Sequence, residues 1–302
     1  PNNPGANLLN WYGDEFGGRN LTLAAPGTPG GVTSTFVTRT PYAERDLIDY
    51  NVRSFMANAS LHYRVSEKVE AIGYYMVGNG TTIYQSANRY NLRNFLFQQA
   101  KFELRGDEFF VRAYATLANS GDSYDATFLG TNLVLQGTGQ DNNTWFNNYS
   151  NAFNAARLAP GATEQSAHAI ARAAADVGRL QPGTDAFNRE RDRLRNTPDF
   201  RVGAAFDDRT NLYHAEGQYD LKNVVDPAIV EAQVGGSYRL FDLNSNGTIF
   251  ADTVNRATGE RNDITIYEWG AYVQLTKRLF DDRLRLTGSM RYDRSEQFVG
   301  RF

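Results

Sequence analysis

The stretch GQDNNTWFNNYSNAF combines aromatic and amide side chains in a pattern that suits binding of a polar organic ligand. Trp145 and Tyr149 offer flat faces for stacking, and Asp141 and Asn143 offer hydrogen-bonding groups beside them. These four residues are the candidate ligand-binding site. An alternative is equally physical: Trp145, Phe146 and Phe153 form a small core onto which the helices of the loop pack, because aromatic rings bury large areas.

Metal and catalytic motifs are not found in this sequence. His62, His168 and His214 lack the HxxxH or HExxH spacing of zinc sites. The stretch DLNSNGTIFADT, from Asp242 to Thr253, begins like a calcium loop, but Thr253 stands where the bidentate Glu is required. An Asn/Gly turn explains it better. GxSxG, P-loop and Rossmann motifs do not occur, so we expect no catalytic residues, no metal, no cofactor and no enzyme activity.

Composition narrows the class of protein. The 302 residues include no Cys, which excludes disulfides, thiolate metal sites and Cys nucleophiles. The net charge of -3 argues against a nucleic-acid partner, which requires a basic face. No apolar run approaches the roughly 18 residues of a transmembrane helix. The chain begins at Pro1 without a signal-type segment, so we expect a processed or excised piece of a longer protein.

Alternation of polar and apolar residues is the strongest pattern in the chain. In NLYHAEGQYDL, His214 and Glu216 fall on one side of an extended chain, and Tyr213 and Ala215 fall on the other. Segments of this kind recur and predict eight antiparallel strands. They span 54–65, 69–78, 92–104, 108–117, 211–221, 229–241, 264–278 and 283–293.

Strand length and connections indicate a membrane protein. Most of these strands have about 10–13 residues, the length that a tilted strand needs to cross a bilayer. Tight turns are expected at 66–68, 105–108, 222–228 and 278–282, and long polar loops at 79–91, 118–210 and 242–262. Outer-membrane barrels alternate turns and loops in this way. The predicted fold is therefore all-β: an antiparallel up-and-down transmembrane β-barrel segment, about eight strands of a larger barrel. The alternative is a soluble β protein.

The domain organisation follows from where the alternation stops. The predicted parts are an extracellular loop region (1–50) and a β-barrel segment (51–302) with a long extracellular insertion (118–210). The insertion contains short helices, one capped by Thr163 and a second beginning at Thr184 or Asp185. We expect it to narrow the barrel mouth and to present Trp145 and Tyr149 to a ligand or partner.

Alternation also predicts which side chains meet lipid. The lipid side takes Tyr213, Ala215, Tyr219, Val230, Ala232 and Val234, and the lumen takes Glu216, Gln218, Glu231 and Gln233. Ala232→Arg is then expected to block assembly, whereas Gln233→Arg is tolerated, because only the first places a charge in hydrocarbon.

Several segments resemble a known family. They are YNVRSFMANASLHYRVSEKVEAIGYY, YNLRNFLFQQAKFELRGDEFFVRAYATLANSGDSYDATFLGTNL, LYHAEGQYDL, GGSYRLFDLNSNGTIFADT and EWGAYVQLTKRLFDDRLRLTGSMRYDRSEQF. Together, from about Thr38 to Phe302, they resemble the barrel region of TonB-dependent outer-membrane receptors of the Bacteroidetes type. The resemblance implies a 22-stranded barrel with a plugged lumen that imports a scarce ligand with energy from TonB. The plug and the TonB box lie outside this chain.

The expected function is import of an extracellular ligand across the cell outer membrane. The partners are outer-membrane lipid, a small-molecule (siderophore), oligosaccharide or peptide ligand, the protein's own plug domain and TonB, with a surface lipoprotein as a further candidate. An alternative function is a barrel that acts as scaffold for a surface lipoprotein or assembly. A third is a soluble carbohydrate-binding β domain. Ligand identity does not follow from the sequence, because binding loops vary most.

Overall fold

The computed structural model describes residues 9–14, 18–25, 30–137, 139–254, 258–259, 262 and 264–301. Its chain divides into two compact units. The helical unit comprises residues 1–52, 81–93 and 122–206, and the sheet unit comprises residues 53–80, 94–121 and 207–302. The N-terminal segment and the long insertion, predicted as separate regions, therefore belong to one unit.

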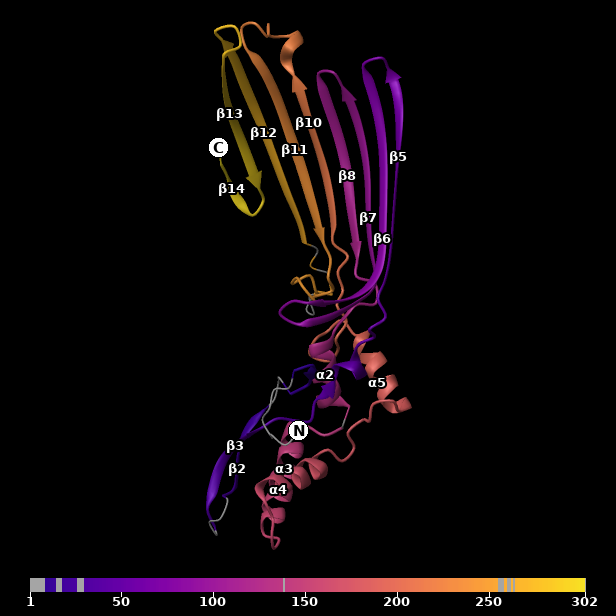
Figure 1. Cartoon of the computed structure of the whole chain (residues 1–302), viewed down its shortest axis with the longest axis vertical. Coiled ribbons are helices and arrows are strands. Elements are labelled where there is room, and N and C mark those ends of the chain that lie inside the picture. The colour runs from indigo at the N-terminus through magenta and orange to yellow at the C-terminus, as the bar shows by residue number, and fades with distance from the viewer. Residues whose placement is uncertain are drawn as a thin grey trace. The chain divides into compact units, whose positions relative to one another are not determined.

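A large antiparallel sheet contains all eight predicted strands (Figure 1). They are β5 (Arg53–Ser66), β6 (Val69–Gln85), β7 (Arg89–Gly106), β8 (Phe109–Asn119), β10 (Asn211–Asp220), β11 (Glu231–Leu243), β12 (Ile264–Leu279) and β13 (Leu284–Ser295). The strand order is β14-β13-β12-β11-β10-β8-β7-β6-β5, and the short β9 (Tyr124–Asp125) pairs with β7. Within the described residues the sheet has two edges, at β5 and β14, and is not closed into a barrel.

Four short connections lie at one end of the sheet, as Figure 1 shows for β5–β6, β7–β8, β10–β11 and β12–β13. The β10–β11 connection contains the 3-10 helix η1 (Leu221–Asn223), whose first turn is capped by the Asp220 side chain. These positions agree with the predicted tight turns. The sheet is thus a meander in which successive long strands pair; β8 pairs with β10, and β9 and the helices of the insertion lie between these two strands in the sequence.

One prediction about connections is wrong, and one short strand was not predicted. The segment 79–91 is not a long loop, because β6 continues to Gln85, β7 begins at Arg89, and Ser86 N–H donates to Asn88 O at 2.9 Å. The segment contains Thr and Tyr, which favour strands, although its Gly, Asn and Ser residues are typical of a loop. A further strand, β14 (Phe298–Arg301), also follows β13 after a short turn.

The helical unit contains five helices and two small sheets among its described residues. The helices are α1 (Glu44–Leu47), α2 (Ala126–Gln136), α3 (Asn142–Arg157), α4 (Glu164–Ala175) and α5 (Asp185–Arg195). Strand β1 (Trp11–Tyr12) pairs with β4 (Tyr42–Ala43), and β2 (Arg19–Ala24) pairs with β3 (Val32–Val37). Both predicted helix starts are confirmed. Thr163 forms a capping box with Ser166, and Thr184 accepts from Phe187 N–H.

Two apolar cores hold the helical unit together. One consists of Tyr42, Leu47, Ile48, Tyr124, Ala126, Leu129, Leu133, Val134, Phe187, Leu194 and Ala204. The other consists of Leu23, Val37, Trp145, Phe146, Tyr149, Phe153, Ala167, Ala171 and Ala175. The prediction that residues 1–50 are only loop is therefore wrong. Leu23 and Val37 are fully buried, since the β2–β3 hairpin packs on α3.

Candidate functional site

Cross-strand register collects polar side chains on one face of the sheet unit. Glu231 faces Thr276, and Gln233 faces Gln274 in the β11–β12 pair. Thr276 in turn faces Thr287 of β13, and their hydroxyl oxygens lie 3.0 Å apart. The Gln274 amide donates to Gln233 Oε1 at 3.4 Å. The alternation of polar and apolar faces predicted for β10 and β11 thus continues in matched rows across neighbouring strands. Val230, predicted on the lipid side, lies just before β11.

Charged groups form a connected row across four strands of this polar face. Arg112 Nε lies 2.5 Å from Glu216 Oε1, and Glu216 Oε2 lies 3.7 Å from His214 Nε2. Arg239 Nε donates to His214 Nδ1 at 3.4 Å, and Arg239 also pairs with Glu268 at 3.4 Å. The row runs from β8 through β10 and β11 to β12. Each charge has an opposite charge or a ring nitrogen beside it, so the row is a network rather than a set of isolated ions.

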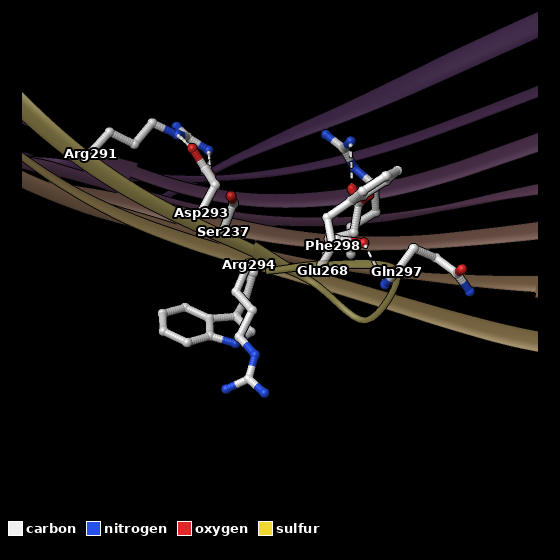
Figure 2. A pocket seen from close by; sticks show the side chains of 10 residues that line it. Ser237, Glu268, Arg291, Asp293, Arg294, Gln297 and Phe298 are labelled. Atoms are coloured by element: carbon white, nitrogen blue, oxygen red, sulfur yellow. Dashed lines mark hydrogen bonds and ion pairs between the residues drawn. The ribbon is translucent and has the colours of Figure 1, made fainter. Parts of the chain in front are cut away.

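A hollow of about 850 Å³ lies at one end of this row. It is lined by Ser237, Arg239, Glu268, Trp269, Arg291, Asp293, Arg294, Ser295, Gln297 and Phe298. Arg291 donates two hydrogen bonds to Asp293, at 2.6 and 2.7 Å. Figure 2 shows Arg291 and Asp293 on one side of the ribbon and Arg294 on the other. Paired guanidinium and carboxylate groups beside an exposed phenylalanine ring can bind a polar ligand that carries hydroxyl, carboxylate or amide groups.

Two glycines make room for side chains on the polar face. A Cβ atom at Gly270 would lie 2.1 Å from Asp293 Oδ1, and a Cβ at Gly235 would lie 2.5 Å from the Tyr272 ring. The Tyr272 hydroxyl donates to Gln218 Oε1 at 2.7 Å. The glycines therefore let a carboxylate and a phenol lie flat across adjacent strands.

The opposite face of the same strands is apolar and open. Its exposed side chains include Phe102, Val111, Tyr213, Tyr219, Val234, Tyr238, Leu275 and Met290. Register places them in rows too, for example Tyr219 opposite Val234 and Val273 opposite Met290. Ala232 is the exception among the residues predicted to face lipid, because it is only 3% exposed.

The four predicted ligand-binding residues lie on α3 or at its N-cap. Trp145 and Tyr149 are buried in the second core, 1% and 0% exposed. Asp141 caps the helix by accepting from Thr144 N–H at 2.7 Å, and Asn143 Oδ1 accepts from Arg19 at 2.7 Å. The burial of Trp145 matches the core alternative, and Tyr149 is buried in the same core. Asp141 and Asn143 remain on the surface, and the ligand-binding role stays a prediction.

Polar groups around the buried rings are satisfied within the helical unit. Trp145 Nε1–H donates to Asp176 Oδ1 at 3.0 Å, and the Tyr149 hydroxyl lies 2.7 Å from His168 Nδ1. Burial raises the pKa of Tyr149 to about 12 and lowers the pKa of His168. The rings therefore act as neutral, hydrogen-bonded parts of the core.

Arg39 is a residue of this core that the sequence pattern did not single out. Its side chain is 2% exposed, lies 5.8 Å from the Trp145 ring centroid and donates to Asn142 Oδ1 at 3.0 Å. Burial lowers its pKa, although the Asp176 carboxylate opposes this effect. The i, i+4, i+8 spacing of Trp145, Tyr149 and Phe153 predicts a helix with one aromatic face, but it does not point to Arg39 as the residue that packs on that face.

The carboxylate of Asp252 stabilises the stretch from Asp242 to Thr253, the one that begins like a calcium loop. Asp252 is 1% exposed and accepts hydrogen bonds from Ser245 N and Oγ, Asn246 N and Gly247 N. Burial by itself raises the pKa of Asp252, but the hydrogen bonds from Ser245 and Gly247 outweigh it and lower the pKa to about 2. Both carboxylate oxygens are thus committed to the turn. Among the described residues no group of three or more His, Asp or Glu is placed to hold a metal ion.

No protein-family model and no curated protein matches this chain. Among the described residues, none of the helices is both long enough and apolar enough to span a membrane.

Proposed function

We propose that this chain is part of a TonB-dependent outer-membrane receptor that binds a scarce extracellular ligand and imports it. The observation that carries the proposal is the separation of polar and apolar side chains onto opposite faces of eight long strands. Both faces are open, and the strands have 10 to 18 residues. A lumen and a bilayer are the two environments that suit such faces.

The apolar face supports a membrane location. Soluble monomers rarely expose a contiguous apolar patch larger than a few hundred Å². Here Phe102, Val111 and Met290 are each more than half exposed, and they lie on three different strands. In lipid this surface needs no covering layer, and the meander satisfies its backbone groups between strands.

The polar face supports a ligand pathway. A lumen lined by Arg112, Glu216, Arg239 and Glu268 can pack against a polar plug and can also contact a polar ligand. The hollow beside Asp293 adds a place where a siderophore, oligosaccharide or peptide can form several hydrogen bonds. The plug and TonB belong to the proposal as partners outside this chain.

The second candidate function, a scaffold for a surface lipoprotein or assembly, is favoured by one surface of the helical unit. Ile170 and Val177, on and just after α4, are 53% and 67% exposed. Exposed apolar side chains of this kind suit a protein partner. The two functions are compatible, since a capping partner can serve a receptor.

Uptake in cells tests the proposal. A strain without the full-length protein is compared with complemented strains, using panels of ferric siderophores, oligosaccharides and peptides as sole nutrient sources. We expect the protein in the outer-membrane fraction and loss of growth on one panel, both after gene deletion and after removal of TonB. Arg239→Ala should reduce uptake, whereas Arg283→Ala, in the β12–β13 turn and outside the residues that line the hollow, should not. Growth that is independent of the protein on every panel contradicts the receptor role.

A further inference from the structure

A groove crosses the apolar face of the sheet unit between β7 and β11. Its volume is about 480 Å³. It is lined by Ala100, Lys101, Phe102, Ala113, Tyr114, Ala115, Tyr213, His214, Ala215, Tyr238 and Leu240. Lys101, Tyr114 and His214 carry their side chains on the polar face, because they alternate with the alanines along the strands. The groove therefore lies within the face proposed to meet lipid.

The groove has a floor of small residues and walls of large ones because of strand register. Ala100 faces Ala115 across β7 and β8, and Ala113 faces Ala215 across β8 and β10. Larger side chains flank this patch. Phe102 faces Ala113, Tyr213 faces Ala115, and Tyr238 faces Ala215. Methyl groups between rings leave a hollow in a surface that elsewhere carries bulky side chains.

The side chains that face the groove carry no charge. They are alanines, Phe102, Leu240 and the two tyrosines. Among the described residues no hydrogen-bond partner is found for the hydroxyl of Tyr213 or Tyr238, and both rings are about half exposed. The occupant thus needs an apolar body and a neutral acceptor for phenol hydroxyls. An acyl chain that ends in an ester carbonyl has both.

Size favours a thin occupant over a protein helix. A helix about 10 Å across fills roughly 400 Å³ per turn, so the groove would hold only about one turn. An unbranched hydrocarbon chain is narrower and can lie along the alanines between the rings. The basic residues among those that line the groove are Lys101 and His214, and strand alternation turns both side chains to the polar face, which favours a neutral or zwitterionic head group.

We infer that this groove binds one acyl chain of a glycerophospholipid, with Tyr213 and Tyr238 donating to its ester carbonyl. The inference rests on the proposed function, since the apolar face must lie in a bilayer. The bound lipid is then a fixed part of the barrel wall over β7, β8 and β10, distinct from the exchanging lipid around it.

The test uses the full-length protein in nanodiscs that contain phosphatidylethanolamine, phosphatidylglycerol, a glycolipid and an apolar helical peptide. The protein is then released into mild detergent, and its mass, with whatever it retains, is measured by native mass spectrometry. We expect one retained glycerophospholipid per protein. Ala113→Phe fills the groove and should lower retention at least tenfold. Tyr238→Phe keeps the shape and should lower it about fivefold, the value of one hydrogen bond. Ala59→Phe, on the exposed strand β5, is the matched control and should leave retention unchanged.

Three outcomes overturn the inference: no retained lipid on the wild-type protein, retention that is equal in Ala113→Phe and Ala59→Phe, or retention of a glycolipid or a peptide instead. Each sample is also assayed for outer-membrane fractionation and for heat-modifiable migration. Membrane insertion without a retained lipid rejects the groove assignment and leaves the proposed function standing. Failure of the wild-type protein to insert rejects the proposed function itself.

Discussion

Met290→Arg separates a membrane barrel from a soluble sheet. Met290 lies in the middle of β13, faces Val273 across the strand pair and is 60% exposed on the apolar face. In water, substitutions at exposed positions of this kind change stability by no more than about 0.5 kcal/mol. If the apolar face lies in a bilayer, the same residue faces hydrocarbon, and the loss of stability caused by Arg is several times larger.

The magnitude follows from two contributions. Placing Arg near the bilayer midplane costs about 2–4 kcal/mol. Removing the Met side chain from an apolar environment costs about 1.5–3 kcal/mol more. We therefore expect Met290→Arg to lower the free energy of unfolding by about 3.5–7 kcal/mol. Gln274→Arg is the control, because Gln274 follows Val273 in β12 and lies on the polar face beside Ser289 and Gln233.

The assay is reversible guanidinium unfolding of the full-length protein in phospholipid vesicles, followed by tryptophan fluorescence. Membrane insertion is monitored in parallel by heat-modifiable migration. The control should lose no more than about 1 kcal/mol, the value of its one weak hydrogen bond. A loss below 1 kcal/mol for Met290→Arg, or equal losses for both variants, would refute the assignment of the apolar face to lipid.

Gly235→Ala should lower the free energy of unfolding by about 1–2 kcal/mol, because the added Cβ displaces the Tyr272 ring that lies across Gly235. Gly288→Ala is the control and should be neutral in the same unfolding assay, because the space around Gly288 is open. Asp252→Asn should remove about 2 kcal/mol at neutral pH. In the wild-type protein this contribution, fully present above the ordinary Asp pKa of 3.8, should disappear in unfolding titrations as the pH falls through about 2. The lowered pKa of His168 means that the unfolded chain binds the proton more readily, so unfolding temperatures should fall as the pH drops below 6.5, and His168→Gln should reduce that dependence. Tyr149→Phe should cost about 1 kcal/mol in the same thermal scan, and no change would contradict its hydrogen bond to the imidazole.

The strands of the sheet could be predicted because their signal is local. Every second residue from Tyr213 to Tyr219 is apolar or small, and a slip of one position would turn each of them to the polar face. The same reasoning missed the β2–β3 hairpin, whose six-residue strands lie in a Gly/Pro-rich segment. It also missed α3, since asparagine disfavours helices and tertiary packing of Trp145 outweighs that preference.

The candidate sites were less predictable than the strands. The polar character of Arg291 and Glu268 follows from alternation, but the hollow between them depends on the turn into β14 and on the position of Gly270. The aromatic residues of α3 were correctly recognised as a cluster. Whether such rings face a ligand or a core depends on what packs against them, which composition does not encode.

Pairing of β8 with β10 links the folding of the two units. Ala118 N–H donates to Thr210 O, and Ser120 N–H donates to Asp208 O, so the strand ends on either side of the insertion are hydrogen-bonded to each other. Closing a flexible loop of about ninety residues between them would cost roughly 4 kcal/mol of chain entropy. If the insertion folds first, its chain has already lost most of this conformational entropy, and pairing of the two strands costs less. Substitutions that loosen the core around Trp145 should therefore slow the pairing of β8 with β10, because the folded insertion lowers the chain entropy that is lost when these two strands pair.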